Sequence, residues 1–222
     1  MSRKLLLVEG ATDVGFFRRL VQDIPAIGDI NIRPPRDFNY PNTVTVLPQL
    51  LPQLIAQLEA GQTTHFGVVA DADHVSGGGI KARWNTLTHV LRGHGYRASQ
   101  TPPSLPNQGS VFQHNDGLPP VGLWLMPNHH QNGMLEDLIL SSVIQNPPQP
   151  ALLSHAKRSI QAIPDDQTLF SPHQHAKALV YTWLAWQQRP GLGLGVALGA
   201  GLLDPQQEPY RGLRSWFERT FS

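Results

Sequence analysis

The sequence contains no cysteine among its 222 residues. Disulfide bonds, zinc sites built on thiolates and catalysis by a thiol are therefore excluded. A chain without cysteine does not depend on an oxidising compartment for its folding, and we expect a cytoplasmic location.

An excess of positive charge is also missing. The 17 lysines and arginines are nearly balanced by 16 acidic residues, which gives a formal net charge of +1. A dedicated nucleic-acid-binding domain usually presents a clearly basic surface. The composition therefore neither supports nor excludes a DNA or RNA partner, and it does not indicate an oligomeric state.

Long hydrophobic runs are absent as well. No apolar run approaches the roughly 20 residues of a membrane span, and the apolar run near the N-terminus is too short for a signal peptide. We therefore expect no membrane partner. Hydrophobic residues still make up 40% of the chain, which is typical of a globular protein with a packed core.

Three short apolar runs predict buried strands at residues 4–8, 65–70 and 121–126. They show no polar alternation, as expected of strands in a parallel sheet whose two faces are both covered. Amphipathic segments between them predict helices. The fold class predicted for this part of the chain is α/β, a Rossmann-like parallel sheet flanked by helices.

Proline and glycine, 20 of each, mark the breaks between elements. The string "NPPQP" at 146–150 separates the α/β part from a tail that shows only helical patterns. We predict an α/β core of residues 1–145 and a C-terminal helical extension of residues 146–222 packed on it. Residues 93–120 predict a loop or short edge hairpins, and Pro52 predicts the start of the second helix.

Acidic residues follow the predicted strands. They are Glu9 and Asp13 after the first, Asp71 and Asp73 after the run at 65–70, and Glu136 and Asp137 after the run at 121–126. Ligands of parallel sheets bind at the carboxyl ends of the strands, and carboxylates gathered there repel one another unless a divalent cation joins them. We therefore predict a metal site, although a lone acid after a strand is most often a cap or a surface residue.

These residues carry a family resemblance. "LLLVEGATDVGFF" at 5–17, followed by "FGVVADADH" at 66–74, resembles the Toprim domain, in which one strand ends in Glu-Gly and a later one in Asp-x-Asp. "VGLWLMPNHHQNGMLEDLI" at 121–139 and the tail at 173–204 are similar to a bacterial Toprim-like group related to OLD-family nucleases.

The resemblance implies roles for the acidic residues. Glu9 would be the general acid or base, and Asp71 and Asp73 would bind Mg²⁺ or Mn²⁺ as cofactor. The further acids that help hold a second metal in OLD-type members correspond by position to Asp13, Glu136 and Asp137.

The chain has no G-x-x-x-x-G-K-[ST] motif, so it would be a Toprim-like protein without an ATPase half. We expect a Mg²⁺-dependent phosphodiester-transfer protein, an OLD-like Toprim nuclease that acts on DNA or RNA. Two alternatives stay open. One is a non-catalytic Toprim-like module that binds a nucleotide, a nucleic acid or a separate protein partner, and the other is a phosphatase with an Asp-x-Asp nucleophile.

Four residues are candidates for binding substrate. Gly10 belongs to the Glu-Gly motif, Lys81 and Arg83 follow the Asp-x-Asp loop, and His129 lies in the loop after the last predicted strand. Lys81, Arg83 and His129 would contact phosphate, and His129 would alternatively serve in proton transfer. The bland alternative is that all three are surface residues in solvent. The glycine-rich string at 191–201 follows no predicted strand, so we expect its small residues to let a helix pack closely.

Overall fold

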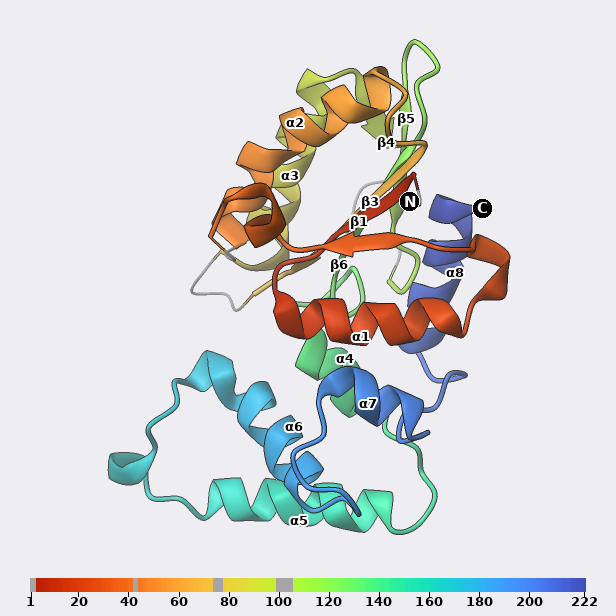
Figure 1. Ribbon diagram of the computed structural model, residues 1–222. Helices are drawn as coiled ribbons and strands as arrows, with labels where there is room; N and C mark the ends of the chain where they lie inside the picture. The colour runs from red at the N-terminus through yellow and green to blue at the C-terminus, as the bar shows by residue number, and fades with distance from the viewer. Residues whose placement is uncertain (1–2, 42–43, 74–77, 99–105) are drawn as a thin grey trace.

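The computed structural model describes residues 3–41, 44–73, 78–98 and 106–222 (Figure 1). They include one six-stranded sheet in the order β2-β1-β3-β6-β5-β4. The strands are β1 (Lys4–Leu7), β2 (Asn31–Arg33), β3 (His65–Asp71), β4 (Tyr96–Ala98), β5 (Ser110–His114) and β6 (Val121–Met126). Strands β2, β1, β3 and β6 are parallel, and β5 runs antiparallel to β6 and β4. The predicted α/β class with a mostly parallel sheet is confirmed.

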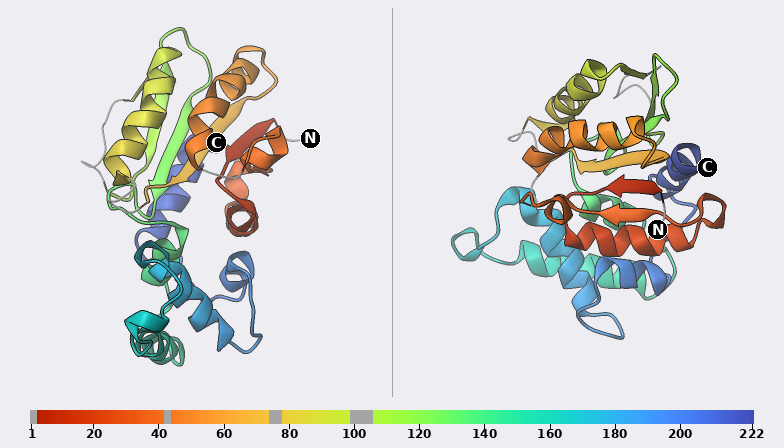
Figure 2. Two further views of the ribbon diagram at one scale, coloured as in Figure 1. Left: turned by 90° about the vertical axis from the view of Figure 1, so that its left-hand side faces the viewer. Right: turned by 45° about the horizontal axis from the view of Figure 1, so that its top comes forward.

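Helices cover both faces of the sheet. The helices in the described ranges are α1 (Ala11–Gln22), α2 (Leu47–Glu59), α3 (Gly79–Gly93), α4 (Leu135–Ser141), α5 (Gln149–Gln161), α6 (His175–Ala185), α7 (Leu194–Gly199) and α8 (Tyr210–Phe221). α2 and α3 pack on one face, and α1 and α8 pack on the other (Figures 1 and 2). The predicted flanking helices are therefore confirmed.

The first strand shows how the sequence specifies these layers. Successive side chains of a strand point to opposite faces. Leu5 and Leu7 join the hydrophobic cluster under α2 and α3, whereas Leu6 and Val8 join the cluster under α1 and α8. An uninterrupted apolar run is what a strand buried on both faces requires.

The sheet ends in a short antiparallel pair. Tyr96 of β4 lies opposite His114 of β5, and Ala98 lies opposite Phe112. The prediction of short edge strands within residues 93–120 is confirmed for the described residues of that segment.

The second helix differs from the prediction. Helix α2 begins at Leu47, and Pro52 lies inside it. A proline within a helix removes one backbone hydrogen bond. Leu50, Leu51 and Leu54 are buried on either side of Pro52, and the burial of these side chains against the sheet offsets that loss. Pro52 therefore does not mark the start of the helix.

The C-terminal helix lies directly on the sheet at two strand glycines. A Cβ atom added to Gly67 of β3 would lie 2.8 Å from the ring of Phe221, and one added to Gly122 of β6 would lie 2.5 Å from Thr220. Larger residues at these positions would push α8 away from the sheet. Glycine thus allows the last helix to cover the middle of the sheet.

The helices α5, α6 and α7 gather at one end of the molecule, beyond α1 and α4 in the view of Figure 1. α7 packs closely on α1, because a Cβ atom added to Gly195 would lie 2.2 Å from the carbonyl oxygen of Gly15. The expectation that small residues at 191–201 allow close packing of a helix is confirmed. None of the helices in the described ranges combines the length and the apolar character needed to cross a membrane.

One hydrophobic cluster joins both parts of the chain. It contains Phe17 of α1 and Trp124 of β6 together with Trp183 of α6 and Phe217 of α8. The boundary expected near residue 145 is therefore not a gap in the core, and the division into a core of residues 1–145 and an extension of residues 146–222 stays a prediction.

Candidate metal centre

The carboxyl ends of β1 and β3 bring two acidic residues together. The strands are adjacent and parallel, with Leu7 opposite Val68. Glu9 lies two residues beyond β1, and Asp71 is the last residue of β3. The Oε1 atom of Glu9 accepts a hydrogen bond of 2.6 Å from the backbone N–H of Asp71. The structure thus joins the two acids that the sequence places at neighbouring strand ends.

Helices α1 and α4 bring further acids to the same edge. The Oδ1 atom of Asp71 accepts a hydrogen bond of 3.1 Å from the N–H of Leu135, the first residue of α4. The next residue, Glu136, is buried, with 4% of its surface exposed. In the first turn of α1, Asp13 accepts a hydrogen bond of 2.8 Å from the N–H of Gly10. Two helix N-termini therefore hold the cluster, which consists of Glu9, Asp13, Asp71 and Glu136 and is here called the acidic edge.

Burial and repulsion act together on Glu9. Burial, together with the charges of Asp13 and Asp73, raises the pKa of its carboxyl to about 8, although the N–H of Asp71 lowers it. A carboxyl with a pKa near neutrality holds or releases a proton under ordinary conditions. This is the property that a general acid or base requires.

The neighbouring acids are perturbed in the same direction. Burial, and then the charge of Glu9, raise the pKa of Asp71 well above its usual range. Burial raises the pKa of Asp13 to about 6, with a contribution from the charge of Glu136. Without added positive charge, the acidic edge is therefore costly to ionise completely.

A lysine of the helical extension lies beside the acidic edge. The Nζ atom of Lys177, in α6, lies 3.8 Å from Oε1 of Glu136. Burial raises the pKa of Glu136, and the positive charge of Lys177 opposes that shift. The same charge lowers the pKa of Asp13. Helix α6 therefore supplies positive charge to an edge built by the α/β part.

Lys177 is not among the site residues predicted from the sequence. It lies two residues after the string "HQH" at 173–175, inside the tail that resembles the Toprim-like group. No strand end or metal-ligand spacing marks it, and only the packing of α6 against α4 places it there.

Asp73 takes a different place from its neighbour Asp71. Its backbone has a left-handed φ of 60° and pairs with Gly133 through hydrogen bonds of 3.0 and 3.1 Å. Its carboxylate forms an ion pair with Arg83. The charge of Asp73 still raises the pKa of Glu9, so Asp73 borders the acidic edge while Arg83 partly neutralises it.

The carboxylate of Asp137 bonds to the start of its own helix. Its Oδ2 atom accepts a hydrogen bond of 2.9 Å from the N–H of Met134 at the start of α4. It lines a small hollow with His173 and His175. Burial raises the pKa of Asp137, and the nearby charge of His175 lowers it. Asp137 therefore acts as a cap of α4 rather than as a member of the edge.

His129 is neither a surface residue nor free to contact phosphate. Only 2% of it is exposed, and its ring lies against Trp84 and Trp124. Its Nδ1 atom accepts a hydrogen bond of 3.0 Å from the N–H of Leu125, and its Nε2 atom lies 3.0 Å from Oγ of Ser110. Burial lowers the pKa of His129 to about 3. Neither alternative from the sequence fits this neutral core histidine.

The other predicted substrate contacts have mixed positions. Gly10 lies at the acidic edge, where its N–H binds Asp13. Arg83 reaches the same region, and its Nε atom also donates a hydrogen bond of 3.1 Å to the carbonyl oxygen of Asp71. Lys81 is exposed on α3. Of these three, Gly10 and Arg83 are the ones whose atoms touch the acidic residues.

The acidic edge has the donor chemistry of a site for a hard cation, but not a finished coordination shell. Within the described ranges, no group of three or more histidine or acidic side chains is arranged to hold a metal ion. Oxygens of Glu9, Asp13 and Asp71 are bonded to backbone N–H groups instead. All the available side-chain donors are carboxylate oxygens, which Mg²⁺ and Mn²⁺ prefer, and a bound cation would relieve their repulsion.

One protein family matches nearly the whole sequence. The match extends over residues 3–222, and the description of the family is "Protein of unknown function (DUF3226)". The chain belongs to the DUF3226 family. No curated protein and no solved structure matches it. Because the DUF3226 match includes both Glu9 and Lys177, the family is defined over the α/β part and the helical part together.

Proposed function

We propose that this protein is a Mg²⁺-dependent phosphodiester-transfer enzyme, an OLD-like Toprim nuclease that acts on DNA or RNA in the cytoplasm. The observation that carries the proposal is the meeting of Glu9 and Asp71 at adjacent strand ends, joined by a 2.6 Å hydrogen bond. Asp13 and Glu136 are buried or partly buried at the same edge. A cytoplasmic location fits a chain that has no cysteine to oxidise.

Asp71, Asp13 and Glu136 are the residues that would hold the metal. Mg²⁺ or Mn²⁺ bound there would polarise a phosphoryl oxygen and orient the attacking group. Burial and neighbouring carboxylates raise the pKa of Asp71 and Asp13, and the positive charge of a bound cation would favour their ionised forms. Asp73, paired with Arg83, would contribute its charge from the border of the edge.

Glu9 and Lys177 would do the remaining chemistry. The pKa of Glu9, raised to about 8, allows its carboxyl to give or take a proton near neutral pH. The N–H of Asp71 fixes the orientation of that carboxyl. Lys177 carries positive charge beside Glu136 and would offset negative charge on a bound phosphate.

The test is cleavage of single-stranded DNA, duplex DNA and RNA by the purified chain with Mg²⁺ or Mn²⁺. Glu9→Gln and Asp71→Asn should each lower the rate by about 100-fold or more, because each removes a group that acts on the reacting atoms. Glu218→Gln and Asp166→Asn remove exposed carboxylates far from the edge along the chain and should cleave like the wild type. Equal cleavage by all five proteins would contradict the proposal.

A second candidate is a non-catalytic module that binds a nucleotide, a nucleic acid or a protein partner. It is favoured by the hydrogen bonds that already occupy carboxylate oxygens of Glu9 and Asp71, and by the pairing of Asp73 with Arg83. Calorimetry with nucleotides and oligonucleotides separates the two candidates, since the module would bind without turnover in any metal.

A further inference from the structure

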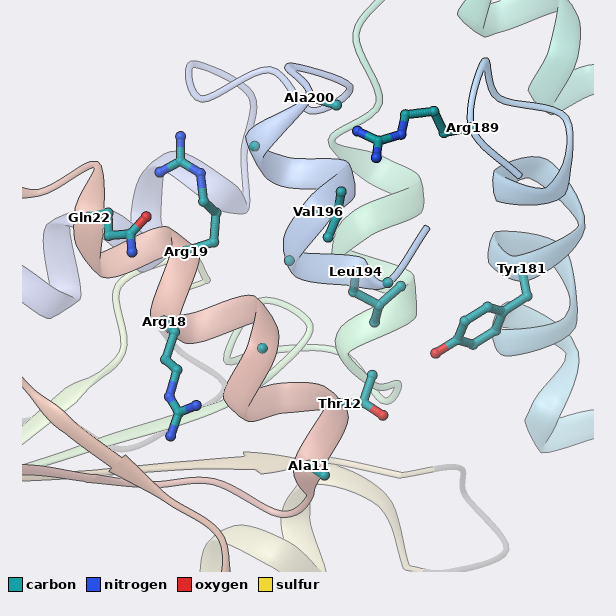
Figure 3. A pocket seen from close by; sticks show the side chains of 14 residues that line it. Ala11, Thr12, Arg18, Arg19, Gln22, Tyr181, Arg189, Leu194, Val196 and Ala200 are labelled. Atoms are coloured by element: carbon teal, nitrogen blue, oxygen red, sulfur yellow. The ribbon is translucent and has the colours of Figure 1, made fainter. Parts of the chain in front are cut away.

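A groove lies between α1 and α7, next to α6 (Figure 3). Its volume is about 800 Å³, which is in the range of ligand-binding sites in proteins. Figure 3 shows Tyr181 and Arg189 facing α1 and α7 across the open space. At one end the groove begins with Ala11 and Thr12, directly before Asp13 of the acidic edge.

The groove is positively charged. Arg18, Arg19 and Arg189 line it, and none of the described residues that line it is acidic. Arg19 forms an ion pair of 2.6 Å with Asp23. The side chains of Arg18 and Arg189 are exposed and make no hydrogen bond or ion pair with other described residues. Their charges are therefore available to an anionic ligand, although the whole chain is nearly neutral.

The groove also offers an apolar and aromatic surface. Tyr181 of α6 is 40% exposed, and Val196 of α7 is 53% exposed. Proteins that bind single-stranded nucleic acid combine cationic side chains, which bind the phosphates, with aromatic rings on which the bases stack. A duplex keeps its bases paired and stacked, so the ring would have nothing to stack against.

We propose that the α1–α7 groove binds a single-stranded stretch of nucleic acid and leads its backbone to the acidic edge. This inference rests on the proposed function, since it names the form of substrate for the same site. From Thr12 to Gln22 the wall formed by α1 is about 15 Å long. Arg18 and Arg189 bind phosphates, and Tyr181 stacks with a base.

The test measures the fluorescence anisotropy of a labelled single-stranded DNA of about 15 nucleotides, in chelator, where no cleavage occurs. The double variant Arg18→Ala/Arg189→Ala should bind about tenfold more weakly and lower the slope of log affinity against log salt by about 1.4. Tyr181→Ala should lower the affinity for the DNA about fivefold without changing that slope, because it removes a stacking ring and no charge, while Tyr181→Phe should retain the affinity. Val196→Glu, which puts a negative charge in the groove, should also weaken binding.

The matched control is Arg92→Ala/Lys157→Ala, which removes the same charge from exposed positions on α3 and α5. It should bind like the wild type. The inference is overturned if the control loses as much affinity as the groove variant, or if neither loses any. Equal affinity for the duplex of the same sequence, or for an acidic peptide of similar length, also overturns it.

Failure of this inference is distinguishable from failure of the proposed function. If the groove variants bind normally while Asp71→Asn abolishes cleavage, the nuclease stands and the groove does not carry the strand. If the groove variants lose binding while no metal supports cleavage, the groove binds single strands and the chain is the non-catalytic module.

Discussion

At the scale of single residues, the acidic edge depends on backbone N–H groups. Glu9, Asp71 and Asp13 each accept one such bond. These bonds hold the carboxylates in place, but they do not remove the repulsion between them. Glu9 shows this most clearly, because burial raises its pKa to about 8 even though it is hydrogen-bonded.

The raised pKa of Glu9 predicts how stability depends on pH. The pKa of Glu9 is about 8 in the folded protein, above its ordinary value of 4.5. Its contribution to the stability of the fold is therefore complete below pH 4.5 and is lost as the pH rises to about 8. His129 acts in the opposite sense, because its pKa in the folded protein is about 3, below its ordinary value of 6.5. Its contribution to stability is complete above pH 6.5 and is lost only as the pH falls below that value.

Between pH 6.5 and about 8, the ionisation of Glu9 therefore changes the stability of the fold while that of His129 does not. In chelator, the midpoint of thermal unfolding should fall by a few degrees over this range. Glu9→Gln should reduce the fall, whereas the exposed Glu218→Gln should leave it unchanged. Identical pH profiles for wild type and Glu9→Gln, measured by calorimetry, would count against the raised pKa.

At the scale of elements, α1 and α7 pack closely because both contribute glycine to their contact. The two glycines are not equivalent. A Cβ atom on Gly195 would lie 2.2 Å from the carbonyl oxygen of Gly15, whereas a Cβ atom on Gly15 would meet nothing within 4 Å. The same substitution therefore has opposite consequences on the two sides of one contact.

Gly195→Ala should lower the free energy of unfolding by about 1–3 kcal/mol, because α7 must move away from α1. Gly15→Ala should leave it unchanged or raise it by up to about 1 kcal/mol, since alanine favours the helix. Urea unfolding of both variants checks the pair. Equal losses would mean that the helices do not approach at Gly195.

At the scale of the whole molecule, the helical extension completes the core of the α/β part. Trp216, Phe217 and Phe221 of α8 are fully buried, and Phe217 packs against Phe17 of α1. Removing these side chains would expose one face of the sheet to water.

A fragment of residues 1–145 should therefore show no cooperative thermal transition by circular dichroism. In the full chain, Phe221→Ala should cost about 3–5 kcal/mol, while Leu169→Ala, at a side chain that is 99% exposed, should cost nothing measurable. A fragment that unfolds cooperatively at the temperature of the full chain would instead establish the boundary near residue 145.

Much of the fold could be predicted because its central strands are buried on both faces. Continuous apolar runs such as "VGLWLM" leave few other structures open. The start of α2 could not be predicted, because packing of leucines on the sheet outweighs the local effect of Pro52. Local preference decides such cases only where tertiary packing does not.

The candidate site was predictable only in part. Glu9 and Asp71 meet because parallel neighbouring strands end at the same edge, and the sequence shows both strands. Lys177 and His129 depend on contacts between distant segments. The position of Lys177 depends on the packing of α6 near Glu136, and the burial of His129 depends on Trp84 and Trp124, which lie against its ring. No local pattern carries that information.

Helix α1 contributes residues to both the acidic edge and the α1–α7 groove. Asp13 faces the acidic edge, and Arg18 lines the groove shared with α7. A ligand that shifts the helix at one of these places changes the free energy of binding at the other. Such coupling is reciprocal: by whatever factor a cation at the edge alters the affinity of the groove, a strand in the groove alters the affinity for the cation by the same factor.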